Sequence, residues 1–355
     1  MIISIEKIRS LSQSIFEKVG LSADDASVMT DVLIQTEMKG VFTHGFLRLE
    51  RYVDCIKAGG IRTDGRIDLV YDSPSWACVD GCDNLGIVVA YKAMLFAMEK
   101  AKATGVGVVN VRGSHHFGAA GYYTGMCADA GMVGLSMSNG DVLIAATGSR
   151  ERTIGNNPFS YAFPAGKYNK IVYDIAMSYT SDRKIAQMAT EGIPLPNGWI
   201  LDRNGSPTTD AREYEKGGVL MPFGGYKGYG LAMMVETLAA TLSGAAMTQK
   251  VHAWNTDPTN GGNVGHFFLA LDISKLGDVD AYRKRVDAMI DEIKASQRAD
   301  GVAEIYYPGE IEQRKLKNCL RENKVKIADE TMDSVYHVAK KLNLHIPDVE
   351  SEVKE

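Results

Sequence analysis

The sequence predicts an α/β (α+β) protein of two domains, and three observations carry this prediction. Apolar residues recur at helical spacing near both ends of the 355-residue chain. Short β-branched runs alternate with helical patterns in between, and glycines gather before one apolar helix. We expect residues 1–70 and 310–355 to form one helical domain. Residues 71–309 are then an α/β domain whose mixed sheet is covered by helices.

Three helices are expected in the first sixty residues. The first is indicated by apolar residues three and four positions apart, and Gly20 ends it. Ser22 followed by Asp25 is a variant of the capping box, and it opens a second helix that ends at Gly40. The third helix is expected over residues 44–58.

The central part of the chain alternates between strand and helix patterns. Runs rich in β-branched residues predict strands at 67–71, 106–111, 132–137, 160–163 and 171–173. Helices are expected between them at about 84–104 and 119–130, which favours a mixed or parallel sheet. The apolar stretch from Leu231 to Met247 predicts a buried helix. Beyond Asp278 the chain is expected to be helical again, apart from a strand-like run at 303–307.

Composition excludes several classes of protein. The net charge is −5, from 39 basic and 44 acidic residues, and no basic cluster indicates a nucleic-acid surface. The apolar share of 45% excludes wholesale disorder. No run is long and apolar enough for a membrane span, and the first residues lack a signal-peptide pattern. Five scattered cysteines complete no zinc site and favour free thiols, so we expect a cytoplasmic protein without a metal.

The segment around His44 predicts a substrate site. If it is helical, His44, Arg48 and Tyr52 fall at i, i+4 and i+8 on one stripe, opposite an apolar face. Arginine can bind a carboxylate through two parallel hydrogen bonds, and histidine can exchange protons near neutral pH. The alternative is a solvated helix face with a chance histidine.

A second candidate is the loop Ser114-His115-His116-Phe117-Gly118, between a predicted strand and a predicted helix. Loops of this kind line ligand crevices in α/β folds. Adjacent side chains point in different directions, so only one of the two histidines is expected to face the site. No metal-binding spacing accompanies them. The alternative is a capping loop without a function.

Glycine is in excess, with 36 residues, about a tenth of the chain against a usual ~7%. The densest cluster is Gly224-Gly-Tyr-Lys-Gly-Tyr-Gly230, directly before the apolar helix. Glycines, free N–H groups at a helix start and the cation of Lys227 favour a phosphate or pyrophosphate site. The pattern is neither a P-loop nor the Rossmann fingerprint. The alternative is a turn with tight helix packing.

Together these segments resemble the malate/L-lactate dehydrogenase family that is unrelated to the Rossmann-type enzymes, and the resemblance covers nearly the whole chain. That family includes sulfolactate, ureidoglycolate and ring-imine dehydrogenases and a diketogulonate reductase. The matching positions are His44-Gly45 with Arg48 and Tyr52, Ser114 with His116-Phe117-Gly118, Gly155 with Asn157-Pro158, Asp174 with Ala176 and Ser178, Pro194 with Trp199 and Asp202, Gly205 with Pro207-Thr208, Pro222 with Gly224–Gly230, and Pro308-Gly309-Glu310.

The resemblance implies an oxidoreductase that uses NAD or NADP on a non-Rossmann α/β domain and acts on a small 2-oxo or 2-hydroxy acid of the malate or lactate type. It also implies a homodimer with a small-molecule substrate. Catalysis is expected from His116, His44 and Arg48, and substrate binding from Thr43, Arg48 and Tyr52. The cofactor-binding positions implied are Asn139, Asp174, Ile175, Ala176, Gly225, Tyr226, Lys227, Gly309 and Glu310.

The chain departs from the family pattern at positions on the expected ligand side. These departures are Thr43 for a common Ser, His115 for a small or amide residue, Asn156 for Thr, Arg183 for Gly, and the loss of a usual Pro within residues 145–148. A ureidoglycolate, keto-sugar-acid or cyclic-imine substrate is therefore the first alternative. A non-catalytic dinucleotide-binding protein is the second, and a metal hydrolase is the most distant.

Overall fold

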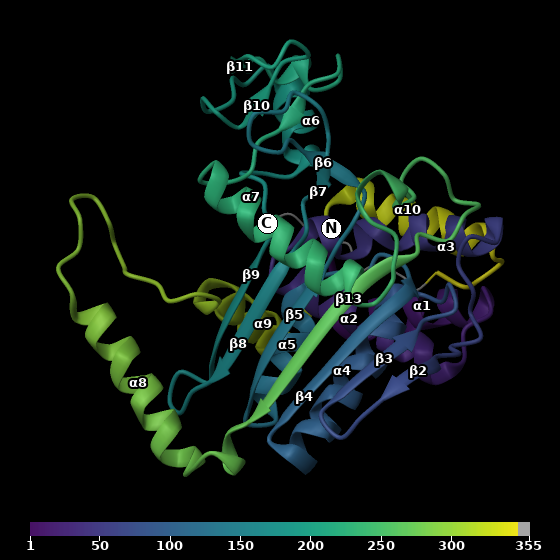
Figure 1. Ribbon diagram of the computed structural model, residues 1–355. Coiled ribbons are helices and arrows are strands. Elements are labelled where there is room, and N and C mark those ends of the chain that lie inside the picture. The colour runs from purple at the N-terminus through teal and green to yellow at the C-terminus, as the bar shows by residue number, and fades with distance from the viewer. Residues whose placement is uncertain (347–355) are drawn as a thin grey trace, which may run out of the picture.

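The structure, a computed structural model, describes residues 1–346, and the last part of the expected helical segment, 347–355, lies outside the described residues. A central seven-stranded sheet has helices packed on one face (Figure 1). In sheet order its strands are β2 (Asp68–Asp72), β3 (Trp76–Asp80), β4 (Val106–Ser114), β13 (Val264–Asp272), β5 (Met132–Ser138), β8 (Phe159–Pro164) and β9 (Lys170–Ile175). Only β3 and β4 pair in parallel, so the sheet is mixed and the α/β prediction is confirmed.

Helices α4 (Gly86–Thr104) and α5 (Ala120–Asp129) cover this sheet. The helix α4 is apolar nearly all round, because it packs on the sheet with one side and on helix α2 with the other. Strand β13 lies at the centre of the sheet although it comes late in the chain. It therefore fixes the ends of β4 and β5, from which two loops of the site described below emerge.

A smaller five-stranded sheet stands at one end of the molecule, at the top of Figure 1. In sheet order its strands are β11 (Pro207–Thr208), β10 (Ile200–Leu201), β12 (Val219–Leu220), β6 (Val142–Ile144) and β7 (Ile154–Gly155). Helix α6 (Asp182–Glu191) packs beside it through the buried Ile185. Strands of two or three residues carry almost no pattern, and the sequence did not predict this sheet.

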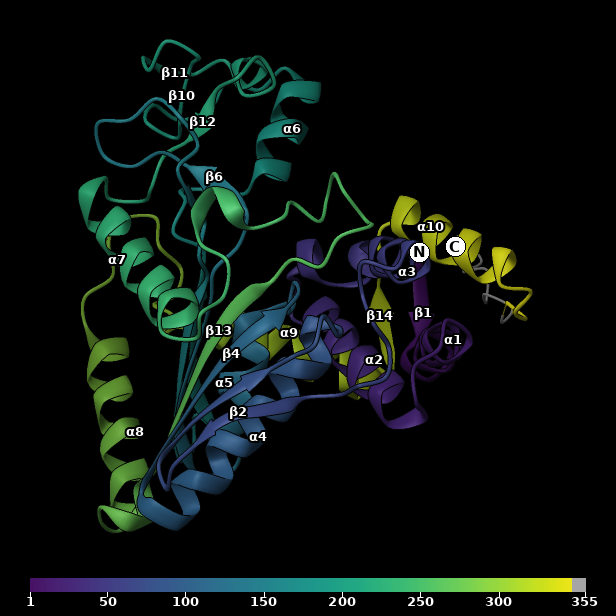
Figure 2. The same ribbon diagram turned by 45° about the vertical axis from the view of Figure 1, so that its right-hand side comes forward.

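The two chain ends meet in a helical region, which Figure 2 shows to one side of the sheet. Strand β1 (Ile2–Ser4) pairs antiparallel with β14 (Lys324–Lys326). The helices of this region are α1 (Ile5–Lys18), α2 (Ala23–Met38), α3 (Leu49–Ala58), α9 (Glu310–Glu322) and α10 (Asp329–Lys341). As the capping box predicts, Ser22 Oγ accepts a hydrogen bond from Asp25 N at 3.2 Å at the start of α2.

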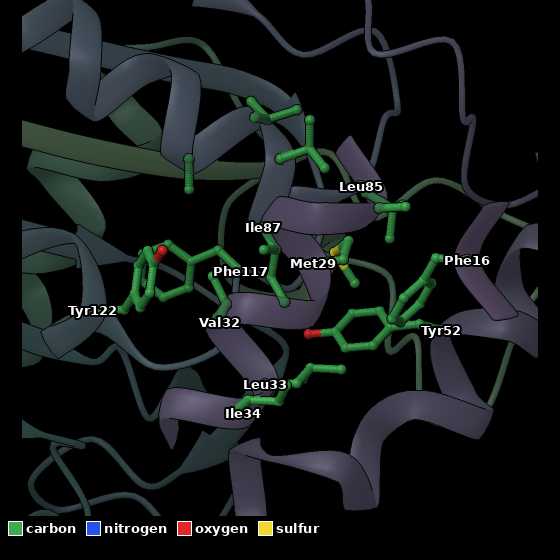
Figure 3. Packing of buried hydrophobic residues seen from close by; sticks show 14 of the residues in the cluster. Phe16, Met29, Val32, Leu33, Ile34, Tyr52, Leu85, Ile87, Phe117 and Tyr122 are labelled. Carbon is green, nitrogen blue, oxygen red and sulfur yellow. The ribbon is translucent and has the colours of Figure 1, made fainter. Parts of the chain in front are cut away.

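One continuous core joins the helical region to the sheet layer (Figure 3). Phe16, Met29 and Tyr52 come from three different helices and are fully buried in it. Phe117, from the loop after β4, belongs to the same core. That loop is therefore packed against α2 and α3 rather than left free in solvent.

Three expected elements differ in the structure. The third helix begins only at Leu49, because two short 3₁₀ turns, Phe42–His44 and Phe46–Arg48, precede it. Residues 303–307 form no strand, since their backbone pairs with no neighbouring strand. Helix α8 (Val279–Ala295) precedes this stretch and docks on the β8–β9 hairpin through Val286 and Ile290.

The apolar helix expected from Leu231 begins earlier, as α7 (Tyr226–Glu236), and continues as a π-helical turn (Thr237–Thr241). It is not buried all round, because Met233 and Leu242 are exposed. Among the described residues, no helix is long and apolar enough to cross a membrane.

Candidate active site

The segment that carries His44 and Arg48 is held by a buried carboxyl group on helix α2. Glu37 Oε2 accepts a hydrogen bond from Phe46 N at 3.0 Å. Gly45 passes so close that a Cβ atom there would collide with the same carboxyl group. Burial raises the pKa of Glu37 to about 7, against the opposing effect of the Phe46 hydrogen bond. Glycine at position 45 and the carboxyl group together fix the break between the two 3₁₀ turns.

Arg48 is held through hydrogen bonds of its Nε and Nη1 atoms, and its guanidinium group has further N–H donors for a ligand. Its Nε donates to the backbone oxygen of Thr43 at 2.8 Å, and its Nη1 lies 3.4 Å from Asn255 Oδ1. Within residues 1–346, no carboxylate lies within ion-pair distance of Arg48. A partly buried guanidinium without an anion is suited to bind one.

His116 lies against two of the residues that the sequence grouped together. The hydroxyl of Tyr52 is 2.6 Å from His116 Nδ1, and the ring of His44 stacks on that of His116 at a centroid distance of 5.5 Å. The Oγ1 atom of Thr43 lies 2.9 Å from His44 Nδ1. The predicted stripe is wrong in one respect, because Tyr52 is fully buried beneath His116 rather than on a non-core face. The expected stripe placed Tyr52 outside the core because it assumed a regular helix from residue 44.

Trp254 packs against the site, and nothing in the sequence pattern indicated it. Its indole ring stacks on His116 at 4.6 Å, and the guanidinium carbon of Arg48 lies 5.7 Å from the ring centre. Arg51 Nε holds the Trp254 backbone oxygen at 2.7 Å. The irregular segment 251–263, called the strap below, is thus fastened to helix α3 beside the two histidines.

His44, His116 and Trp254 line a cavity of about 70 Å³, enough for several water-sized groups. It is lined by His44, His115, His116, Phe117, Gly118, Ser138, Asn139, Gly140, Asp141, Asn156, Pro158, Val251, His252, Trp254, Gly262 and Val264. The expectation that only one histidine of the pair faces the site is therefore wrong. The chain bends through positive φ at Gly113 and Gly118, which turns both rings toward the strap.

Withdrawal from solvent decides the charge of the histidines. Desolvation, aided by Arg48, lowers the pKa of His44 to about 4. Desolvation and the neighbouring His44 and Arg48 lower the pKa of His116 well below its ordinary value. Both imidazoles are therefore neutral at pH 7, and each offers one donor and one acceptor nitrogen.

The expected cofactor positions lie in three places. Asn139 lines the cavity, but its side chain is engaged with Gly265 N at 2.8 Å and Ala246 O at 2.9 Å. Asp174, Ile175 and Ala176 lie at the end of β9, where Asp174 Oδ2 accepts from Gly121 N at 2.6 Å in the first turn of α5.

Gly309 and Glu310 lie beside the same strand, since a Cβ atom on Gly309 would collide with the backbone oxygen of Val172. Glu310 is buried and paired with Lys294 at 2.8 Å and Arg314 at 2.6 Å, so its side chain holds the fold together. Position 309 thus needs glycine. Glu310 has a structural role, whether or not it also contacts a cofactor.

Comparison with known proteins identifies the family of the chain. A model of the malate/L-lactate dehydrogenase family matches residues 3–335. The chain belongs to this family. The malate dehydrogenase of Pyrococcus horikoshii is 38% identical over 312 residues, 86% of either chain. The ureidoglycolate dehydrogenase (NAD(+)) of Escherichia coli O157:H7 is 28% identical over 330 residues, 93% of either chain.

The solved structure of sulfolactate dehydrogenase from Methanocaldococcus jannaschii has a TM-score of 0.91 at 35% identity and covers 98% of both chains. The resemblance drawn from sequence motifs is thereby confirmed. The relatives cover nearly the full length of this chain, so the match includes both the helical region and the sheet.

A nicotinamide dinucleotide, which the family implies, fits the start of α7. Gly225 precedes this helix with φ +64°, and no atom lies within 4 Å of a Cβ placed there. Lys227 and Tyr226 are exposed beside this open space. The predicted boundary was wrong, because Gly228 and Gly230 lie inside the helix. Gly228 is nevertheless required, since a Cβ there would collide with the backbone oxygen of Phe223.

Backbone contacts connect this open glycine turn to the end of β9. Phe223 N donates to Met177 O at 2.9 Å, and Ser178 pairs with Pro222 in an isolated bridge. Two of the three groups of expected cofactor positions are therefore adjacent through the main chain. Among the described residues, no group of three His, Cys, Asp or Glu side chains is arranged to hold a metal ion.

Proposed function

We propose that this protein transfers a hydride between NAD or NADP and C2 of a small 2-oxo or 2-hydroxy acid of the malate or lactate type. One observation carries the proposal most directly. A guanidinium group without a carboxylate partner among the described residues stands beside two stacked neutral histidines that line a cavity. Family membership supports the same reaction class.

In this proposal Arg48 binds the carboxylate of the substrate. Its Nε is fixed on Thr43 O, and its guanidinium carbon lies 5.7 Å from the ring centre of Trp254, which lines the cavity. Because the guanidinium is planar, it can hold both carboxylate oxygens and so fix the orientation of the adjacent C2 carbon.

His116 is the proposed proton carrier, with His44 as its close rival. In oxidation, Nδ1–H of the neutral ring donates to Tyr52, and the free Nε2 takes the hydroxyl proton, which gives an imidazolium ion. Reduction is the reverse: the imidazolium donates its Nε2 proton to the oxygen on C2 and returns to the neutral Nδ1–H form. Tyr52 holds Nδ1 at 2.6 Å in both directions and is the proposed positioning residue.

The dinucleotide is proposed to lie against Gly225, Tyr226 and Lys227, the end of β9 and Gly309, on an α/β domain spanning 71–309. When bound, its nicotinamide ring supplies or accepts the hydride at C4. Lys227 contributes positive charge toward the phosphates, and Trp254 and the strap exclude water from the reacting atoms. Residues 1–70 and 310–346 form the proposed helical domain that carries Arg48 and Tyr52.

A homodimer is proposed because apolar side chains remain uncovered near the open glycine turn. Leu231, Met233 and Leu242 are 37%, 45% and 49% exposed along α7 and the following turn. Patches of this kind mark contacts between subunits. Light scattering on the purified protein is expected to give twice the chain mass of 38.6 kDa. A mass of 38.6 kDa at micromolar concentration contradicts the dimer.

A panel of 2-oxo acids, with NADH and NADPH in turn, tests the reaction through the nicotinamide absorbance. We expect turnover of at least one 2-oxo acid and a clear preference for one cofactor. Turnover of a cyclic imine or oxidation of ureidoglycolate, with none of any 2-oxo acid, would replace the substrate class. Binding of NADH without turnover of any compound would overturn the enzymatic proposal.

His116→Ala tests the proposed proton carrier. The loss of a general acid–base group should lower kcat about 10²- to 10⁴-fold while the NADH dissociation constant changes less than twofold. Fluorescence titration measures the binding, and His337→Ala, an exposed histidine on α10, is the matched control. Equal losses in binding and turnover would show that His116 is needed for the cofactor site instead.

A further inference from the structure

His115 is a buried histidine whose ring is not hydrogen-bonded by the fold. It is 1% exposed, and neither ring nitrogen has a hydrogen-bond partner among residues 1–346. A second buried histidine, His266, shows the usual arrangement. Its ring nitrogens lie 2.9 Å from Ser138 Oγ and 2.8 Å from Ser114 Oγ. Buried polar side chains are nearly always paired, so His115 needs an explanation that His266 does not.

The position of His115 places it at the site. It precedes His116 in the chain, and both rings contact the same indole of Trp254, His115 edge-on at 5.4 Å and His116 stacked at 4.6 Å. Both residues line the cavity described above. A small molecule that reacts at His116 can therefore extend past the edge of Trp254 toward His115.

The surroundings of His115 determine what it can recognise. Burial, together with the nearby Arg51, lowers the pKa of His115 to about 4, so the ring is neutral at pH 7 and has one donor and one acceptor nitrogen. Arg51 donates to the backbone oxygen of Trp254 through two of its nitrogens. Gly262 of the strap closes the opposite side, where a Cβ atom would lie 3.6 Å from His115 Cδ2. The ring is thus confined, uncharged and able to donate one hydrogen bond to an oxygen.

We propose that His115 is a specificity-determining residue that hydrogen-bonds an oxygen on the part of the substrate remote from C2. The protein then selects 2-oxo acids whose chain ends in a hydroxyl or carboxylate group over alkyl chains of the same size. This inference rests on the proposed 2-oxo acid reaction.

The physical reason is the cost of an unpaired buried donor. An alkyl chain in the same space leaves the N–H of His115 without a partner, whereas an oxygen pairs with it. Sites that hydrogen-bond a substrate group discriminate strongly against analogues that lack the group, but apolar pockets do so weakly. We therefore expect about a 10- to 100-fold preference to depend on this one side chain.

Three substrates and three variants test the proposal. The pair 3-hydroxypyruvate and 2-oxobutyrate differs by a hydroxyl in place of a methyl group, and oxaloacetate adds the carboxylate. His115→Phe and His115→Met remove the donor while filling the space, and His115→Gln keeps an N–H donor. His337→Phe is the surface control, and NADH affinity and thermal melting are followed for every variant.

The wild type is expected to prefer at least one of the two oxygen-bearing substrates to 2-oxobutyrate in kcat/KM. The Phe and Met variants should lose this preference at least tenfold, because kcat/KM falls for the oxygen-bearing substrate and rises for 2-oxobutyrate, whose alkyl chain no longer meets an unpaired donor; the Gln variant should retain part of the preference. A lost preference for 3-hydroxypyruvate over 2-oxobutyrate would show that His115 binds the substrate hydroxyl group. A lost preference for oxaloacetate would show that it binds the terminal carboxylate. If Phe does not fold, the Met and Gln variants provide the same comparison.

A ratio that is the same in the wild type and in the Met or Phe variant would overturn the role of His115. So would a Gln variant no better than Met. These outcomes differ from failure of the proposed reaction itself, in which the wild type reduces no 2-oxo acid at all.

Discussion

The two regions proposed to bind ligands are built in opposite ways. The substrate cavity is partly enclosed by Trp254, and desolvation lowers the pKa of His44 and of His116. The glycine turn before α7 is open, with exposed Tyr226 and Lys227 and free space over Gly225.

The difference shows where each side chain can act. Charges and hydrogen bonds are stronger in a closed site, because water does not compete with them. In the open turn, solvent and salt screen the same interactions. Changes in the cavity should therefore alter catalysis strongly, and changes at the turn should alter cofactor affinity slightly.

The largest effect is expected from Arg48→Ala. It removes the guanidinium that we propose for the carboxylate, so kcat/KM should fall at least about 100-fold, the equivalent of about 3 kcal/mol for a lost charge-assisted pair. Arg48→Lys should recover only part of this loss, because an ammonium group cannot form two parallel hydrogen bonds. Steady-state kinetics measure both, and Arg285→Ala on α8 is the control. Wild-type kinetics in the Ala variant would place carboxylate binding elsewhere.

A smaller effect is expected from pH, because the pH dependence of kcat/KM reports whether the histidines are shielded from solvent. A histidine base with the ordinary pKa of 6.5 would lose about tenfold of its neutral form on going from pH 7.5 to 5.5. The pKa of His44 is about 4 and that of His116 is also lowered, so both stay neutral over this range. We expect kcat/KM for hydroxy-acid oxidation to change less than about twofold between these pH values. A tenfold fall would mean that the site is more open to solvent than the structure indicates.

The smallest effect is expected from Lys227→Ala. An exposed cation contributes less than about 1 kcal/mol, so the NAD(P)H dissociation constant should rise about two- to fivefold, and less so at high salt. The kcat value at saturating cofactor should stay unchanged, and Lys340→Ala on α10 should have no effect. A large fall in kcat would contradict the division between the two regions.

Much of the fold could be predicted from the sequence, because long periodic segments carry strong patterns. The strands at β4, β5 and β9 and the helices α1, α2, α4 and α5 lie within a few residues of their expected bounds. The central position of β13 could not be predicted, since strand order depends on contacts between distant segments. The small sheet was missed because strands of two residues have no periodicity.

The sequence grouped residues that lie near one another in the structure, but it did not give their geometry. His44 and His116 line one cavity, Tyr52 contacts His116, and Arg48 lies 5.7 Å from the Trp254 ring; that these residues form the active site stays a prediction. The helical spacing of the segment could not show that Gly45 breaks the helix, because that break depends on Glu37 from another helix. Trp254 lies in the irregular strap, residues 251–263, where composition alone gives no reason to select one residue.

The buried carboxyl group of Glu37 makes folding consume a proton. Its pKa is about 7 in the folded chain and 4.5 when exposed, so between these values the folded protein holds a proton that the unfolded chain has released. This linkage makes its contribution to stability greatest below pH 4.5, and that contribution declines as pH rises toward 7. Folding near pH 6 therefore gives a proton to the residue that holds the turn between His44 and Arg48, whereas His44 and His116, whose pKa values are lowered, give up protons when they are buried.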